Sequence, residues 1–351
     1  MKGALALLAF APVVVATAIA GVVSSPSKVR PCITGFSDGL SSGPNHLELG
    51  PDGALWSNEQ NNRIARFDLQ TKKATEVRVP DDTQLHELET GPDGNLWFTG
   101  LKGRLGRLDV ETRKVTLFPG IDPESQPHHL WWGPDAKAYV SEFLGGRLAR
   151  FDPKTRRVTE LRYNLPPDRG IHGYVELPDH TTWWALQNVD QIARFDTRTQ
   201  RFDSFVQLPS GSGPHWLEYV PSENAIWVAL AYANDLIRYD LDTGRVERFD
   251  LGLRATTATE LRSRAPVPTL TFMMLDAAGR NLWLADLAGG EAVRFDLETH
   301  VAKRVGCGFR FPSFTITLAN DSDGNLWITE SPPPGRGGTP PGPGRLALIR
   351  R

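Results

Sequence analysis

Short stretches in which apolar and polar residues alternate recur along the whole chain. In the stretch 63–68 (RIARFD), Ile64 and Arg66 alternate with Ala65 and Phe67. Side chains of a strand point alternately to its two faces, so this pattern predicts a strand that is packed on both sides. Similar stretches occupy residues 63–68, 104–109, 147–152, 191–196, 235–240, 291–296 and, in a degenerate form, 345–350.

A turn and a strand centred on an aromatic residue precede each of these stretches, as in "GPDGALWSNE" (50–59) and "GPDGNLWFTG" (91–100). The first five repeats follow one another at intervals of 41 to 44 residues. Units of this size with several short strands are typical of β-propeller blades. We expect four strands in each unit, A to D from the inside outward, with the aromatic residues of strands B and C packed between blades.

The repeats therefore predict an all-β fold, a seven-bladed β-propeller of four-stranded blades over residues 43–351. The seventh repeat reaches the end of the sequence after its third strand. We expect the N-terminal segment 21–42 to close the ring, with residues 28–36 supplying the missing outer strand of the last blade.

The first residues have a different character. Lys2 is followed by an apolar run over residues 4–23, with small residues at Ala18 and Ala20. This pattern predicts a signal peptide over residues 1–20 and a secreted, extracellular protein. An uncleaved N-terminal anchor is the alternative, because the run is long enough to span a bilayer.

Composition narrows the range of partners. Charged residues make up 23% of the chain, the formal net charge is −2, and no run of basic residues occurs. Because nucleic acids and anionic membranes attract basic patches, we expect neither as a partner beyond the N-terminal segment. We expect a monomer.

Only two cysteines are present, Cys32 and Cys307, one near each end of the chain. In an oxidising compartment two thiols can pair, so they form a candidate disulfide. Two unpaired, partly buried thiols are the alternative.

Histidines recur in register with the repeats. The position five residues before each turn is occupied by Asn45, His86, His128, His172 and His215 in the first five repeats. Because inner strands of a propeller line its central channel, we expect an arc of imidazoles around the axis. His46 and His129 lie one residue further on, so strand alternation predicts that they point away from the channel.

Carboxylates are expected at the same rim, where strand B ends. Glu59 and Glu142 lie there, fourteen residues after the histidine register, and Glu330 and Asp286 end the corresponding strands of later repeats. Imidazoles and carboxylates that converge at a channel mouth suit a divalent metal ion or a general base. The alternative is that polar side chains merely fill a wet channel.

Two long insertions are expected at this rim as well, residues 251–268 and the Pro/Gly-rich 331–344. Long loops in a compact domain are often functional, so these segments are candidates for walling or covering a pocket.

These motifs resemble those of the virginiamycin B lyase (streptogramin lyase) family. The stretches that carry the resemblance are "GPDGNLWFTG…RLGRLD" (91–109) and "QPHHLWWGPDAKAYVSE" (126–142), and the repeat pattern extends over the whole mature chain. Known lyases of this family open a cyclic depsipeptide at its ester linkage by elimination, with magnesium at the channel mouth.

The resemblance implies roles for individual residues. His128 corresponds to the general base, Glu142 to the carboxylate of strand B and His86 to the histidine of the preceding blade. The remaining family position, a glutamate, is occupied by Gln126. The implied ligands of Mg²⁺ or another divalent cation are His86, Glu142 and Gln126. Further contacts to a ligand are expected from His172, His215, Glu59, Asn45, Glu330 and Asp286.

Three functions follow as hypotheses. The first is a secreted carbon–oxygen lyase, assisted by a metal ion, that opens a small molecule or cyclic peptide containing an ester or lactone. The second is a non-catalytic propeller that binds a ligand or a protein at the same rim. A calcium-dependent hydrolase of the lactonase type is the third, and it is less favoured because its sites use Glu, Asn and Asp. The repeats lack the Trp-Asp dipeptide of WD-type scaffolds.

Overall fold

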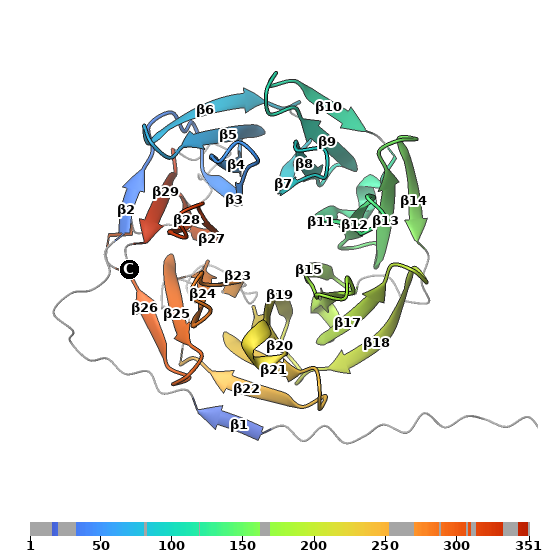
Figure 1. The fold of residues 1–351 in the computed structure, drawn as a ribbon, viewed down its shortest axis with the longest axis vertical. Coiled ribbons are helices and arrows are strands. Elements are labelled where there is room, and N and C mark those ends of the chain that lie inside the picture. Colours follow the sequence, from blue (N-terminus) through green and yellow to red (C-terminus); the bar gives the residue numbers. More distant parts are fainter. Residues whose placement is uncertain are drawn as a thin grey trace, which may run out of the picture.

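Seven antiparallel sheets stand around a central channel and form a closed ring (Figure 1). The computed structural model describes residues 16–19, 33–80, 83–118, 120–161, 169–252, 270–287, 289–306, 308–309, 314–332 and 343–349, without the side chains of 16–19. In this part of the chain the secondary structure is almost entirely β, with three short 3₁₀ turns. The predicted seven-bladed propeller is confirmed.

Each blade is a meander, and its strands follow one another in chain order from the channel to the outside. Blades one to three contain β3 (Pro44–Leu49), β4 (Leu55–Glu59), β5 (Arg63–Asp68) and β6 (Lys73–Arg78); β7 (Leu85–Thr90), β8 (Leu96–Gly100), β9 (Arg104–Leu108) and β10 (Val115–Phe118); and β11 (Pro127–Trp132), β12 (Ala138–Glu142), β13 (Arg147–Asp152) and β14 (Arg157–Leu161). The 3₁₀ turn η1 (Pro123–Ser125) precedes the third blade.

The remaining blades repeat this order. Blades four to six contain β15 (Ile171–Glu176), β16 (Thr182–Leu186), β17 (Gln191–Asp196) and β18 (Arg201–Gln207); β19 (Pro214–Val220), β20 (Ala225–Leu230), β21 (Asp235–Asp240) and β22 (Val246–Asp250); and β23 (Leu270–Leu275), β24 (Asn281–Asp286), β25 (Glu291–Asp296) and β26 (Ala302–Val305). The turns η2 (Gln187–Val189) and η3 (Pro221–Glu223) lie in blades four and five.

The last blade closes the ring with strands from both ends of the chain. It contains β27 (Phe314–Asn320), β28 (Leu326–Ser331) and β29 (Arg345–Ile349), and β2 (Ile33–Phe36) pairs antiparallel with β29 as the outer strand. The predicted closure by the N-terminal segment is therefore confirmed, over a shorter strand than 28–36.

A further strand, β1 (Ala16–Ile19), pairs in parallel with the outer strand β22 of blade five. It falls within residues 1–20, whose role as a signal peptide or anchor stays a prediction. Within the described residues, no helix is long and apolar enough to span a membrane. Cys32, Cys307 and most of both long insertions lie outside the described residues.

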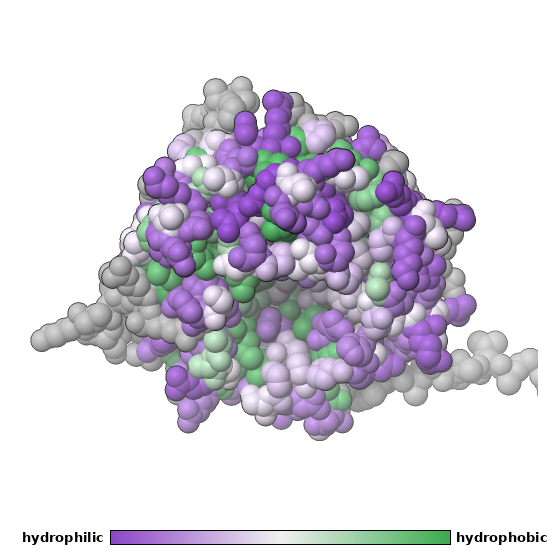
Figure 2. All heavy atoms as spheres, turned by 45° about the horizontal axis from the view of Figure 1, so that its top comes forward, coloured by the Kyte–Doolittle hydropathy of each residue, from purple (hydrophilic) through white to green (hydrophobic). Residues whose placement is uncertain are grey.

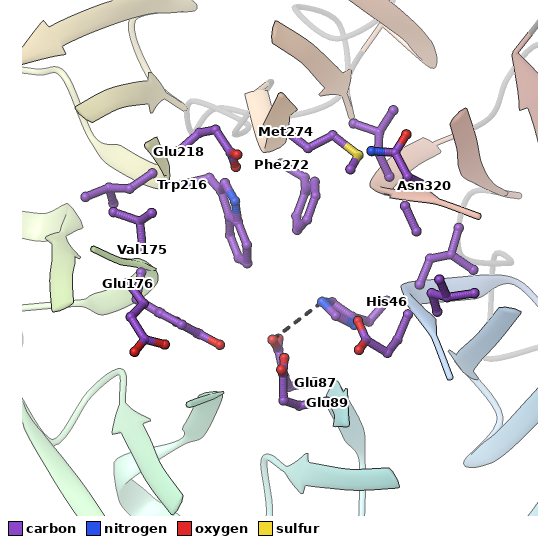
Figure 3. Close-up of a pocket in the computed structure, with 17 residues that line it drawn as sticks. His46, Glu87, Glu89, Val175, Glu176, Trp216, Glu218, Phe272, Met274 and Asn320 are labelled. Atoms are coloured by element: carbon purple, nitrogen blue, oxygen red, sulfur yellow. Dashed lines mark ion pairs between the residues drawn. The ribbon is translucent and has the colours of Figure 1, made fainter. Parts of the chain in front are cut away.

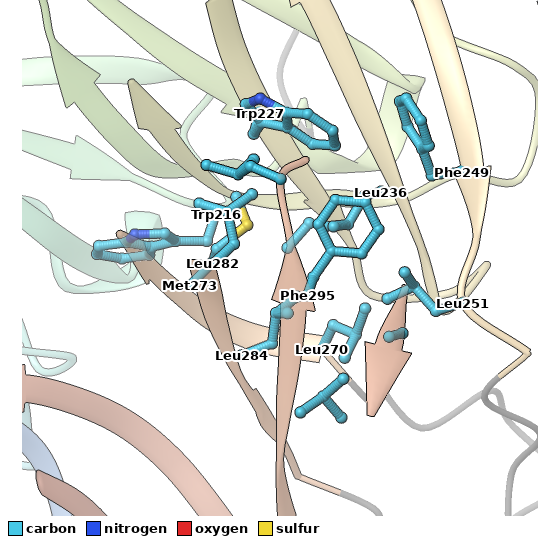
Figure 4. Packing of buried hydrophobic residues seen from close by; sticks show 14 of the residues in the cluster. Trp216, Trp227, Leu236, Phe249, Leu251, Leu270, Met273, Leu282, Leu284 and Phe295 are labelled. Carbon is cyan, nitrogen blue, oxygen red and sulfur yellow. The ribbon is translucent and has the colours of Figure 1, made fainter. Parts of the chain in front are cut away.

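The hydrophobic core consists of layers between neighbouring blades. Ala65 and Phe67 pack against Trp327 of blade seven, whereas Ile64 packs toward blade two. Between blades five and six, Trp227 and Phe295 meet with ring centroids 5.3 Å apart (Figure 4). The alternation of residues in each repeat is thus explained, because each strand must bury both faces.

The repeated turn holds strands B and C together. In blade one, the Asp52 carboxylate accepts hydrogen bonds from Trp56 Nε1 (2.8 Å) and Arg66 Nε (2.6 Å). A Cβ atom on Gly50 would lie 2.3 Å from the Trp56 ring, so the motif requires glycine there. Asp93 binds Trp97 and Arg107 in the same way in blade two. These bonds fix each inner hairpin, whose first strand lines the channel.

Candidate functional site

Four histidines from neighbouring blades meet in the channel, and we call His86, His128, His172 and His215 the imidazole arc. Successive ring centroids are 3.5, 4.5 and 3.7 Å apart along this order. His172 is buried, whereas His86, His128 and His215 are partly exposed. The inner strands bring these residues together because each contributes the same position to the channel.

Every inner strand also contains a β-bulge next to the arc position. In blade three the register shifts between Pro127 and Leu130, so that His128 and His129 together oppose Ser141. The bulge is held by a hydrogen bond from the His129 amide to Ser141 Oγ (2.9 Å). Register shifts at the matching positions of the other six blades occur in β3, β7, β15, β19, β23 and β27.

The bulge overturns the prediction that His46 and His129 point away from the channel. His129 Nδ1 lies 2.6 Å from Glu87 Oε2, and its Nε2 lies 3.1 Å from His172 Nδ1. His46 Nε2 lies 3.5 Å from Glu87 Oε1. A bulge inserts one residue and breaks the two-residue alternation, so adjacent residues face the same side.

Hydrogen bonds between blades fix the positions of the arc. The Asn58 side chain accepts from the His46 amide (2.6 Å) and donates to the His86 carbonyl (2.6 Å). In the next blade Thr99 Oγ1 accepts from the Glu87 amide and donates to the His128 carbonyl (2.5 Å). In blades one and two, strand B thus ties its own inner strand to that of the following blade.

Burial keeps the imidazoles of the channel neutral. It lowers the pKa of His86, His128 and His172 well below the ordinary value of 6.5, and neighbouring imidazoles lower it further. Burial also lowers the pKa of His129 and of His215 to about 3. At neutral pH these rings therefore carry lone pairs that can accept a proton or bind a metal ion.

The carboxylates predicted at the rim are instead paired within their blades. Glu142 Oε2 lies 2.8 Å from Arg147 Nε, and Glu142 has no ion pair or hydrogen bond with His128 among the described interactions. Glu330 likewise contacts Arg345 (2.6 Å) and Asp286 contacts Arg304 (3.0 Å). The convergence of these carboxylates with the histidines stays a prediction.

The remaining predicted residues also lie apart from the arc's contacts. Glu59 is within 3.4 Å of Ser41 Oγ, and burial with the nearby Glu76 carboxyl raises the pKa of Glu59 to about 9. Gln126 is exposed and adopts a left-handed conformation (φ 52°) at the end of η1. Asn45 is the second residue of β3, and its carbonyl accepts a hydrogen bond from Thr317 Oγ1 (2.7 Å).

The residues predicted to hold magnesium do not fit that ion. Glu142 is neutralised by Arg147 and Gln126 lies at the surface, so His86 is left without the oxygen ligands that Mg²⁺ prefers. A different group comes closer to a metal site: the ligand atoms of His128, His129 and His172 lie within 4.8 Å of one another. Imidazole nitrogens suit a borderline ion such as Zn²⁺.

A second region of the channel is acidic, and the sequence analysis missed it. A cavity of about 460 Å³, which we call the acidic cavity, is lined by Glu48, Glu87, Glu89 and Glu218 together with aromatic residues (Figure 3). Burial raises the pKa of Glu48 and Glu87 to about 7 and that of Glu218 to about 8. The clue in the sequence was a glutamate one or three residues after the arc position, which the bulge turns inward.

Glu87 connects the two regions, because it lines the acidic cavity and also contacts His129, which packs against the imidazole arc. Its carboxyl group contacts both His46 and His129, which lie beside the arc. On the side of the molecule that Figure 2 shows, hydrophilic residues cover most of the surface, with hydrophobic patches between them.

The fold and the channel define a β-propeller protein with a histidine-lined central channel. The chain belongs to the virginiamycin B lyase family, whose model matches residues 37–264. This match confirms the family resemblance drawn from the repeats. No curated protein matches the chain by sequence.

Solved structures with the same fold cover most of the chain. A catalytically inactive histidine-to-alanine variant of virginiamycin B lyase from Staphylococcus aureus, with quinupristin, aligns with a TM-score of 0.74 at 16% identity, over 91% of this chain and 99% of that chain. A streptogramin B lyase aligns with a TM-score of 0.72 at 17% identity, over 91% and 98%. Hydrazine synthase of Kuenenia stuttgartiensis aligns with a TM-score of 0.67 at 16% identity, over 94% and 99%. At these identities the likeness concerns the fold.

Proposed function

We propose that the protein is a carbon–oxygen lyase that opens an ester- or lactone-containing ligand at the imidazole arc. The observation that carries this proposal is the arc itself, a group of neutral imidazoles from four neighbouring blades inside the channel of a virginiamycin B lyase family member. Neutral imidazole is the form of histidine that acts as a general base.

His128 is the base in this proposal. It is partly exposed to the channel, whereas its neighbours His129 and His172 are only 4% and 5% exposed. A ring nitrogen of His128 takes a proton from the alcohol side of the ester, from a carbon that lies next to a second carbonyl group and is bonded to the carbon carrying the ester oxygen. The electron pair of that C–H bond forms a double bond between these two carbons, and the alkyl carbon–oxygen bond breaks, so that its electron pair leaves with the ester oxygen as a carboxylate. No water is consumed.

Glu87 stabilises the positive charge that forms on the arc. Its carboxyl group contacts His129, and the His129 ring centroid lies 4.9 Å from that of His128. A nearby carboxylate favours an imidazolium electrostatically, and here it acts across His129 without touching the base. No step is assigned to magnesium, because the residues predicted to bind it do not form a ligand set.

The test is incubation of the purified protein with quinupristin and a panel of smaller esters and lactones, followed by mass spectrometry. Elimination within a ring gives an opened product of unchanged mass, whereas hydrolysis of the lactonase type adds the mass of water. We expect an opened product of unchanged mass from the wild type and none from His128→Ala. The exposed His180, replaced by Asn, serves as the control outside the channel.

A non-catalytic ligand-binding propeller is the second candidate. It is favoured by the pairing of Glu142 with Arg147, which removes a carboxylate that the related lyases use. This candidate predicts saturable binding of a ligand with no product from any member of the panel.

A further inference from the structure

The acidic cavity gathers carboxyl groups from several blades, and His46 is the one basic residue among the described residues that line it. Glu48 lies on β3, Glu87 and Glu89 on β7, and Glu218 on β19. The residues that line this cavity include no lysine or arginine. The pKa of Glu89 lies well above its ordinary value, because burial and the neighbouring Glu48 and Glu87 carboxyl groups raise it. Such a group of acids is stabilised by a cation.

Aromatic rings form the other side of the same cavity. Trp216 and Phe272 are packed with ring centroids 4.2 Å apart, and Figure 3 shows them opposite Glu87 and Glu89, with Glu218 and Met274 beside them. Trp216 is only 9% exposed. Faces of tryptophan and phenylalanine attract cations through the ring quadrupole, and the attraction grows when water is excluded.

One residue that lines the cavity also has an unsatisfied polar atom. His46 is 7% exposed and lines the cavity, and its Nδ1 is buried without a hydrogen-bond partner among the described residues. Buried polar atoms normally have a partner, so an orphaned nitrogen in a cavity wall points to a ligand or water molecule.

We propose that the acidic cavity binds a small organic cation, a quaternary ammonium or protonated amine, between the carboxyl groups of Glu48, Glu89 and Glu218 and the rings of Trp216 and Phe272. A hard divalent cation is less favoured, because Trp216, Phe272 and Met274 form part of this wall and supply none of the oxygen ligands that Mg²⁺ and Ca²⁺ prefer. This inference goes beyond the proposed function, since binding here does not depend on turnover at the arc.

Calorimetric titration of the full-length protein with choline tests the proposal. The matched ligand is 3,3-dimethyl-1-butanol, which has the shape of choline but no charge. We expect saturable binding of choline at least about tenfold tighter than that of the neutral alcohol, which corresponds to about 1.4 kcal/mol. Equal binding of the two ligands, or no saturable binding of choline, overturns the proposal. Calcium that binds tightly and displaces choline overturns the organic class.

Variants locate the binding. Glu218→Gln removes one carboxylate at nearly constant volume, and we expect about tenfold weaker choline binding. Glu111→Gln, at an exposed turn of blade two, is the control and should bind choline as the wild type does. Unchanged affinity in a folded Glu218→Gln protein contradicts the assignment. If that variant does not fold, the comparison of the two ligands on the wild type still decides the question.

The protonation of the cavity gives an independent readout. Because the Glu48 and Glu218 carboxyl groups hold protons near neutral pH, a bound cation should displace protons and bind more tightly as pH rises from 6 toward 8. Titrations in buffers of different ionisation enthalpy measure this release. Binding that is independent of pH contradicts a role for these acids.

Discussion

The imidazole arc and the acidic cavity are built on the same inner strands but present opposite chemistry to the channel. In blade two, His86 joins the arc, while Glu87 and Glu89, one and three residues further on, line the cavity. Burial drives both regions toward their neutral forms, since it lowers the pKa of the imidazoles and raises that of the carboxyl groups. One bulged strand therefore supplies basic side chains to one site and acidic side chains to the site next to it.

The difference predicts that the two regions can be inactivated separately. The largest effect is expected from His128→Ala, which should lower kcat/KM for an opened ester by about 100-fold or more, the usual contribution of a general base. Its affinity for choline should stay within about twofold of the wild type, within the spread of mutations at separate sites. Kinetics and calorimetry on the same preparation measure both. Parallel loss of both properties means that the channel is a single site.

Carboxylates at the end of strand B are expected to act on stability and not on chemistry. Glu142→Ala removes the contact with Arg147, which keeps Asp122 and Glu160 as partners, so the protein should be destabilised by about 1 kcal/mol. Turnover per folded molecule should change little. Urea unfolding gives the free energy, and active-site-normalised rates give the activity. If turnover is lost while stability is unchanged, Glu142 acts in the chemistry, as the family resemblance implies.

The response of turnover to metal ions should show whether His128, His129 and His172 form a site for Zn²⁺ or the channel holds Mg²⁺. Zn²⁺ is expected to inhibit turnover about tenfold or more by occupying His128, His129 and His172, since imidazole ligands favour it. A chelator should reverse this inhibition. Mg²⁺ should alter the rate less than twofold, within the scatter of such assays. Strict dependence of turnover on Mg²⁺ contradicts this view of the site.

The smallest effect concerns pH and the acidic cavity. Glu218 has a folded-state pKa of about 8 against an ordinary value of 4.5, so the folded protein holds a proton that the unfolded chain releases. The corresponding stability is complete below pH 4.5 and is lost as pH rises through 8. Glu218→Gln should therefore raise Tm relative to wild type at pH 9 by roughly 2–4 °C, but not at pH 5. An equal shift at both pH values contradicts burial of this acid.

The fold was predictable from the sequence because its rules are local and repeated. The alternation of Ala65 and Phe67 with Ile64 reports packing on two neighbouring blades, and the truncated last repeat indicates closure by the N-terminal segment. Repetition every 41 to 44 residues confirms the same inference several times over.

The site was less predictable because one assumption failed. Strict alternation placed His46 and His129 outside the channel, whereas a bulge next to the arc turns them inward. The same bulge brings Glu87 to the histidines. The pairing of Glu142 is not visible in the repeat register, because its partner Arg147 begins the adjacent strand and meets it only through the pairing of strands B and C.

Direct measurement of the protonation of the channel histidines tests the account most sharply. NMR titration of the imidazole signals, assigned through single His→Gln variants, follows His46, His86, His128, His129, His172 and His215 from pH 8 to pH 5. The account predicts that all six stay neutral at pH 6.5, because burial lowers each pKa below that value. Half-protonation of His128 or His129 at or above pH 6.5 would contradict a buried cluster of neutral imidazoles.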